Sequence, residues 1–493
     1  MLFNSLEFIL IFLPIVTLVF LSLERLNYLS WALVWLSLTS VFFYAYGQWH
    51  YSLLLIGSLS INYGLARWLL NTPNRYLLIL GISSNLLVLA YYKYTHFFLT
   101  NLSYLTAWPL PHLEIILPLG ISFFTFQQIA FLVDVYKKAI QPHSFINYAV
   151  FISFFPQLIA GPIVHYQEVV PQMGKQRNFA VISADLKIGL TIFLIGLFKK
   201  YAIADSLALP ANQVFDQADQ LASLDTLDAW RGVLAYSFQI YFDFSGYSDM
   251  AIGLGKLFGF NLPLNFFSPY KANNIAEFWR RWHMTLSRFL RDYLYIPLGG
   301  NQCGYRRTSL NLIIVMFLGG LWHGAGWNFV IWGLLQGCYL AIHQLFTHIQ
   351  REFAIPISQR KILKLLSYLG SWTITFTAIN LAWIFFRAKT WSGAVHLLTT
   401  VTTFSQWTWH LNITTDFYLV LALVITLFLP NTWQLMRHHL PHIIPPVKTT
   451  EVNWPNWHWQ FNDHWATIAG LLMAVIIIKM IQGQPTEFIY FQF

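Results

Sequence analysis

The tetrad Leu321-Trp322-His323-Gly324 places a titratable ring inside an apolar stretch that covers residues 310–332. An ionisable side chain is costly at membrane depth, so a histidine there is a candidate for a functional site. The glycines on both sides of the tetrad would let backbone or substrate approach closely. The alternative is a histidine that only satisfies its hydrogen bonds within a helix bundle, because buried polar groups need partners whatever their role.

The composition of the whole chain is that of a protein that lives in lipid. Of its 493 residues, 56% are hydrophobic and only 10% are charged, whereas soluble domains carry about 25% charged residues. Aromatic residues reach 18%, an excess that suits the belts at membrane interfaces. The formal charge of +9 is scattered at the ends of apolar runs, which indicates cytoplasmic loops rather than nucleic-acid binding. We expect a polytopic integral membrane protein.

Apolar runs long enough to cross a bilayer recur along the chain, and several are interrupted by proline or glycine, as at Pro118, Pro156 and Gly161. Broken helices at membrane depth are tolerated where protein or a water-filled cavity satisfies the freed backbone groups. At about 20 residues per span, we expect an all-α fold of about eleven transmembrane helices, with re-entrant or broken helices around a central cavity or tunnel. The whole of residues 1–493 would form one integral membrane domain. The candidate spans are roughly residues 6–23, 29–46, 50–70, 76–92, 113–136, 146–164, 184–203, 229–258, 308–346 (broken), 365–386, 415–431 and 464–481.

Orientation follows from the short loops, because Lys and Arg favour the cytoplasmic side. The basic loops are assigned to the cytoplasm and the acidic stretch 205–228 to the outside, which leaves both termini outside the inner (plasma) membrane. Lys199 and Lys200 fit this assignment poorly, so they line a cavity or the boundary is misplaced. Asp243 and Asp249 lie in a run long enough to span. Each costs roughly 2.5–3.5 kcal/mol at a helix centre, which a basic partner or a cavity would offset.

Residues 274–291 predict a helix at the membrane surface. Asn274 suits the N-cap position, and Glu277 three residues later resembles a capping box. The arginines that follow stand among phenylalanine and tryptophan. They indicate either snorkelling side chains at the interface or a basic, aromatic-lined pocket for an anionic donor such as a phosphate-bearing thioester.

Two histidines, His283 and His323, complete a set of residues suited to acyl transfer. A neutral imidazole near pH 7 can take a proton from a hydroxyl, which suits transfer to an alcohol within the membrane. Two other functions fit the same residues. Broken helices and intramembrane charges are also typical of a transporter or flippase for a lipid or glycan precursor, and a scaffold for a polysaccharide-export complex would need the histidines only for packing.

Several motifs, in order along most of the chain, resemble the membrane-bound O-acyltransferase (MBOAT) family. They are most similar to its alginate O-acetylation branch and less similar to teichoic-acid D-alanylation proteins. The motifs are residues 118–127, 155–163, 243–253, 278–283 with 295–301, and 321–324.

The resemblance implies a fold, an activity and a set of site residues. By position, His323 matches the essential histidine of the family and His283 its second active-site histidine. The family function implied is transfer of an acyl group, acetyl in this branch, from cytoplasmic acetyl-CoA or another thioester across the membrane to an extracytoplasmic polysaccharide. A secreted or membrane-anchored acetyltransferase partner would complete the reaction. We expect no bound cofactor, no metal and no nucleic acid. Substrate contacts are expected from Trp322, Asp243, Asn273, Arg280 and Arg281.

The C-terminal stretch 485–493 is rich in aromatic residues. Its position favours an aromatic anchor at the outer interface. It also resembles a short aromatic tail of this branch in which a tyrosine is proposed to carry the acyl group, which makes Tyr490 a candidate acyl relay. A phenol is a weak nucleophile at its usual pKa of about 10, so His323 would have to activate it.

Overall fold

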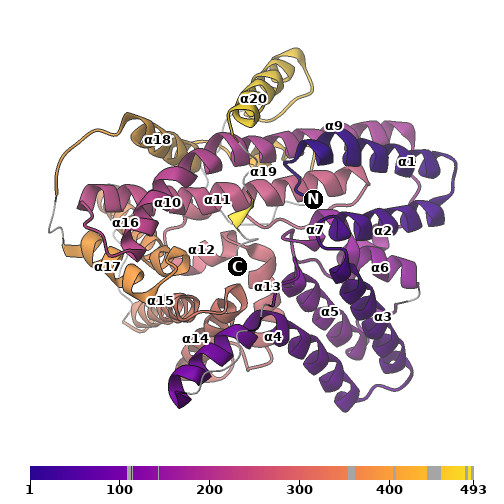
Figure 1. The fold of residues 1–493 in the computed structure, drawn as a ribbon, viewed down its shortest axis with the longest axis horizontal. Coiled ribbons are helices and arrows are strands. Elements are labelled where there is room, and N and C mark those ends of the chain that lie inside the picture. Colours follow the sequence, from indigo (N-terminus) through magenta and orange to yellow (C-terminus); the bar gives the residue numbers. More distant parts are fainter. Residues whose placement is uncertain are drawn as a thin grey trace.

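The computed structural model describes residues 1–107, 113, 115–142, 144–353, 361–403, 407–440, 457–483 and 487–489. Over these residues the chain is helical and contains no strand (Figure 1). Seven helices in this part of the chain are long and apolar enough to cross a membrane, and three shorter apolar helices accompany them. The chain is therefore a multi-pass membrane protein. The finer estimate of about eleven spans remains a prediction.

The helices are, in chain order, η1 (Phe8–Phe12), α1 (Leu13–Arg25), α2 (Leu29–Ala45), α3 (His50–Asn71), α4 (Arg75–Thr106), α5 (Ile121–Tyr136), α6 (Phe145–Ser153), α7 (Phe155–Leu158), α8 (Tyr166–Val169), η2 (Val170–Gln172), α9 (Phe179–Phe198), η3 (Lys199–Ala204), α10 (Asp205–Asp219), α11 (Thr226–Leu257), η4 (Pro269–Lys271), α12 (Ile275–Arg281), α13 (Met284–Leu290), η5 (Arg291–Tyr295), α14 (Gly304–His323), α15 (Trp327–Glu352), α16 (Lys361–Arg387), α17 (Trp391–Thr403), α18 (Ile413–Phe428), α19 (Thr432–Leu435) and α20 (Asp463–Gln482).

Helix α11 forms the centre of the fold and is buried along almost its whole length. It lies beside α9 (Figure 1), and small residues bring the two backbones into contact. A Cβ added at Gly189 would lie 2.6 Å from the carbonyl oxygen of Gly253, and one added at Gly196 would lie 2.6 Å from that of Gly246. Close approach through small residues is the usual way in which helices pack within a membrane.

Ion pairs join α11 to the π-helical turn η3. The Lys199 Nζ lies 2.6 Å from the Asp249 carboxylate, and the Lys200 Nζ lies 2.7 Å from Asp243 and 2.9 Å from Asp205. The expectation that a basic partner offsets the cost of the two α11 carboxylates is confirmed. The same pairs explain why the two lysines fitted the loop assignment poorly, since they face the interior instead of a cytoplasmic surface.

The apolar run 308–346 folds as a hairpin of two helices, α14 and α15, rather than as one interrupted span. The helix α14 ends at His323 because Gly324 leaves the helical conformation, and α15 begins after Gly326. A Cβ at Gly320 would lie 2.4 Å from the Phe329 carbonyl oxygen, so the two helices touch through their backbones. The hairpin turn therefore places His323 at the end of a rigid element.

The segment 274–291 begins as expected and then breaks. The Asn274 Oδ1 accepts a hydrogen bond of 2.8 Å from the Glu277 amide, which confirms the N-cap. The prediction of one continuous helix is wrong, because α12 ends at Arg281 and α13 begins at Met284. Between them, His283 takes a left-handed backbone conformation with φ of 44°. A non-glycine residue in that region is held there only by its surroundings.

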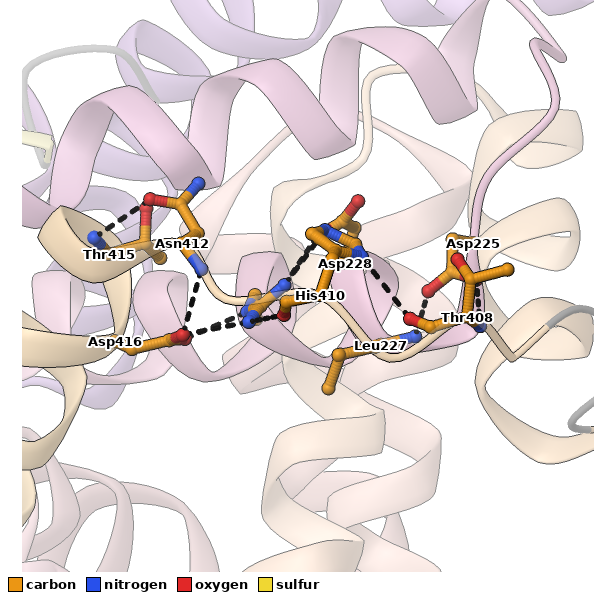
Figure 2. Close-up of polar contacts among 9 residues, drawn as sticks. Asp225, Leu227, Asp228, Thr408, His410, Asn412, Thr415 and Asp416 are labelled. Carbon is orange, nitrogen blue, oxygen red and sulfur yellow. Dashed lines mark hydrogen bonds and ion pairs between the residues drawn. The ribbon is translucent and has the colours of Figure 1, made fainter.

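A polar cluster ties the start of α11 to the loop before α18 (Figure 2). The hydroxyl and the amide of Thr408 each donate to Asp225 at 2.7 Å. Desolvation acts to raise the pKa of Asp225, but these hydrogen bonds outweigh it and the pKa lies below its ordinary value. Arg231 of α11 binds Asp416 of α18 through two bonds of 2.8 Å. The two helices are therefore joined at this end by a bidentate pair.

The hairpin contact predicts a stability difference between two glycine variants. Gly320→Ala should lower the apparent melting temperature of the detergent-solubilised protein, because the new methyl group meets the Phe329 carbonyl and such overpacking costs about 1–3 kcal/mol. Gly64→Ala is the matched control, since nothing lies within 4 Å of a Cβ at Gly64. Equal melting temperatures for the two variants would contradict the backbone contact.

Candidate active site

His283 is held at the break between α12 and α13 by an asparagine. Its ring is fully buried, and its Nδ1 lies 3.0 Å from the Asn265 Oδ1. The Thr285 hydroxyl donates to the same Oδ1 at 3.0 Å, which identifies this atom as an acceptor. Because a carbonyl oxygen only accepts, Nδ1 carries the proton, and Nε2 is the acceptor nitrogen of the neutral ring. Asn265 thus sets both the tautomer and the orientation of His283.

His323 lies at the C-terminus of α14, where aromatic rings surround it. Its ring centroid is 4.9 Å from that of Trp322, 5.0 Å from Trp332 and 5.1 Å from Phe386. The rings of His283 and His323 are 6.4 Å apart. The fold therefore brings the two histidines singled out in the sequence into one buried site.

His323 lines a small cavity of about 70 Å³. Trp322, Lys93 of α4 and residues 117–123 also line it. The Lys93 Nζ donates to the carbonyl oxygens of Trp322 at 2.6 Å and His323 at 3.0 Å. Sequence reasoning missed this lysine because the predicted span stopped at residue 92, whereas α4 continues to Thr106.

A larger cavity of about 870 Å³ is lined by residues of α12, α13, η5 and α14. Met284 and Thr285, the two residues after His283, form part of its lining. Three arginines also line it, Arg280, Arg288 and Arg291. Arg288 binds Glu168 at 2.8 Å and Arg291 binds Asp292 at 2.6 Å. Arg280 has no carboxylate partner among the described residues, so its charge is available to a ligand.

The structure distributes the expected substrate-binding residues among different places. Trp322 lines the small cavity and Arg280 the large one. Arg281 is buried and binds Glu277 at 2.7 Å. Asn273 lines a third cavity of about 600 Å³ between α15 and α16. These residues therefore do not form one pocket, and the two cavities beside the histidines share no lining residue in the described part of the chain.

Asp243 holds the C-terminal segment inside the fold. Its Oδ2 accepts a hydrogen bond of 2.9 Å from the Ile489 amide, while Lys200 donates to the Glu487 carbonyl oxygen at 3.2 Å. The ring of Phe488 is buried with its centroid 4.6 Å from that of Tyr247. Residues 488 and 489 thus pack against α11 instead of forming an anchor at the interface. Tyr490, the expected relay, lies outside the described residues.

One group of described residues has the spacing of a metal site. Asp225, Asp228 and His410 offer ligand atoms within 4.8 Å of one another (Figure 2). The Arg231 Nη1 already lies 3.0 Å from both the Asp228 carboxylate and the His410 Nε2. The guanidinium of Arg231 therefore supplies the positive charge that a metal ion would otherwise bring. The cluster joins α11 to α18.

These features define a class of protein: a polytopic membrane protein with two neighbouring buried imidazoles, a small cavity lined by one of them and a larger cavity lined by arginines. The sequence model of the membrane-bound O-acyltransferase family, MBOAT, matches residues 43–386, which include both histidines. The chain belongs to this family and is an acyltransferase. Membership decides against the transporter and scaffold hypotheses.

Relatives of known annotation are similar over most of the chain. The peptidoglycan O-acetyltransferase of Helicobacter pylori is 47% identical over 430 residues, which cover 81% of this chain and 79% of that protein. The probable alginate O-acetylase AlgI of Pseudomonas aeruginosa is 39% identical over 83% of this chain and 76% of its own length. The corresponding protein of Pseudomonas putida is 34% identical over the full length of both chains.

The orientation of His283 by Asn265 predicts a loss of turnover in Asn265→Ala. The variant should lose about 10–100-fold in acyl-transfer rate, as is typical when a functional histidine loses its orienting partner. Asn62→Ala serves as the control, because it removes another buried amide, bonded to Asn85 at 3.2 Å, that does not contact either histidine. Turnover equal to the control would show that the Asn265 contact is dispensable.

Proposed function

We propose that this chain is an O-acetyltransferase that moves acetyl groups from cytoplasmic acetyl-CoA across the inner membrane, for O-acetylation of an extracytoplasmic polysaccharide. The observation that carries the proposal is a pair of buried imidazole rings, 6.4 Å apart. His323 lines a cavity of about 70 Å³, and Met284 and Thr285, which follow His283, line another of about 870 Å³. The larger cavity suits a large anionic donor. The smaller one suits a small acyl group and the hydroxyl that receives it.

The larger cavity has the properties of a site for a phosphate-bearing thioester. Its volume of about 870 Å³ falls within the range of small-molecule sites. Arg280 supplies an unneutralised guanidinium for phosphate oxygens, while Trp279 and Met316 supply apolar wall. Arg306 and Arg307 lie in the first turn of α14. By the positive-inside rule we assign this end of α14 to the cytoplasmic side, together with Asn301 of the cavity lining.

In the proposed reaction His323 is the general base. It takes the proton of the acceptor hydroxyl as that oxygen attacks the thioester carbonyl. The tetrahedral intermediate collapses, the carbon–sulfur bond breaks, and the imidazolium returns the proton to the leaving thiolate. His283, fixed by Asn265, positions the reacting groups. The buried indole N–H of Trp322 has no acceptor among the described residues, so it can donate to the carbonyl oxygen as charge develops.

The C-terminal segment is the proposed first acceptor. The Ile489 amide is bound to Asp243, which holds the residue that precedes Tyr490 in the sequence. In this proposal His323 removes the phenol proton of Tyr490, the phenol oxygen attacks the thioester carbonyl, and the carbon–sulfur bond breaks to release the thiol with that proton. A secreted or membrane-anchored acetyltransferase then passes the group to the polymer. Relatives are named for peptidoglycan and for alginate, which supports a polysaccharide acceptor.

Replacement of the base tests the central role. His323→Ala should reduce acetyl transfer by about 10²–10⁴-fold, the usual contribution of a general base, while the protein still inserts and accumulates. The measurement is transfer of labelled acetyl from acetyl-CoA by purified protein in proteoliposomes. His348→Ala is the control, since this exposed histidine contacts only Tyr305 and Glu352 among the described residues. Wild-type transfer by His323→Ala would overturn the assignment.

The relay makes a separate prediction. With labelled acetyl-CoA and no polymer, the label should accumulate on the wild-type protein in an ester bond, which hydroxylamine cleaves. Tyr490→Phe should remove that label because the phenol oxygen is its attachment point, and His323→Ala should remove it as well. Tyr104→Phe, at a highly exposed tyrosine, should retain it. Label that persists on Tyr490→Phe would exclude the relay and leave the role of His323 untouched.

A further inference from the structure

Lys93 is a partly buried lysine of α4 that has no carboxylate partner among the described residues. In the described part of the chain it has no ion pair, and its Nζ donates only to the carbonyl oxygens of Trp322 and His323. The other deeply placed lysines differ, because Lys199 and Lys200 each bind an aspartate of α11. A lysine without an ion pair inside a membrane-spanning helix is costly, which makes it a candidate functional residue.

Helix capping explains only part of this arrangement. The last carbonyl groups of a helix have no partner within the helix and carry a partial negative charge. Tyr94 donates its hydroxyl to the Leu321 carbonyl at 2.6 Å, and Lys93 serves the next two carbonyls. The neutral tyrosine shows that the end of α14 can be capped without a charge. The ammonium of Lys93 therefore needs a further reason.

The small cavity supplies that reason. Lys93, Trp322 and His323 all line it. An ammonium has three N–H groups, two of which reach the carbonyls, so the third is available to the cavity. The indole N–H of Trp322 is likewise without an acceptor among the described residues. Donors that line such a cavity can stabilise negative charge that develops there.

We propose that Lys93 is a further catalytic residue of the acyl-transfer site. It holds the backbone of His323 through the carbonyl oxygen of that residue, and its remaining N–H donates into the small cavity, where the carbonyl oxygen of the acyl group gains charge. This inference rests on the proposed function of His323. It assigns to α4 a part in the reaction that the sequence motifs of the site do not include.

Three variants separate the charge of Lys93 from its capping role. Lys93→Met, which keeps the length of the side chain, should lower kcat by about 10²-fold, as is typical for loss of one donor to an oxyanion. The KM for acetyl-CoA should stay unchanged, because the two cavities share no described lining residue. Lys93→Arg should restore part of kcat. Tyr94→Phe removes only the neutral cap, so it should lose less than about tenfold, in line with a single hydrogen bond.

The outcomes are distinct. A kcat of Lys93→Met near wild type, or an equal loss in Tyr94→Phe, would show that Lys93 is only a cap. If Lys93→Met fails to accumulate, Lys93→Gln replaces it, since the amide keeps donors without the charge, and wild-type kcat in that variant would overturn the proposal. His323→Ala in the same assay tests the underlying function. Activity in His323→Ala defeats that function, whereas an inactive His323→Ala beside active Lys93 variants defeats only the role of Lys93.

Discussion

Ion pairs between helices allow charged residues to lie at the centre of this membrane protein. Lys199 with Asp249 and Lys200 with Asp243 lock η3 to α11, around which the other helices pack. The active site depends on that axis, because Phe244 of α11 packs against His283 with ring centroids 4.8 Å apart. Removal of one partner would leave a buried charge, which is far more costly than loss of the pair.

The same need for internal partners shapes the site itself. A chain that breaks its helices in lipid must satisfy the freed groups from within the protein. At His283 the break is held by Asn265, which binds both the imidazole and the neighbouring Thr285. At the end of α14 the carbonyl groups are met by Lys93 and Tyr94 of α4. The side chains that hold the histidines in place thus also satisfy the backbone groups that the helix breaks leave unpaired.

Features set by local sequence could be predicted, and those set by distant contacts could not. Hydropathy identified the membrane class, the motifs identified His283 and His323, and Asn274 was recognised as a helix cap. The break at His283 was missed because its backbone is fixed by Asn265, which is distant in sequence. Lys93 was placed beyond a span, because hydropathy alone does not show that this lysine binds carbonyl oxygens at the end of α14. The sequence predicted that Asp243 and Asp249 would have basic partners, but only the structure shows that these partners are Lys200 and Lys199.

The separation of the two cavities has a consequence for the choice of acyl group. No described residue lines both of them, and His323 lines only the smaller one. If the donor binds in the larger cavity, as proposed, the group that it transfers must leave that cavity to reach His323. A donor too large for the smaller cavity would then take part in the reaction only through the small group that it hands over. The size of the smaller cavity would thus limit which acyl groups the protein can transfer.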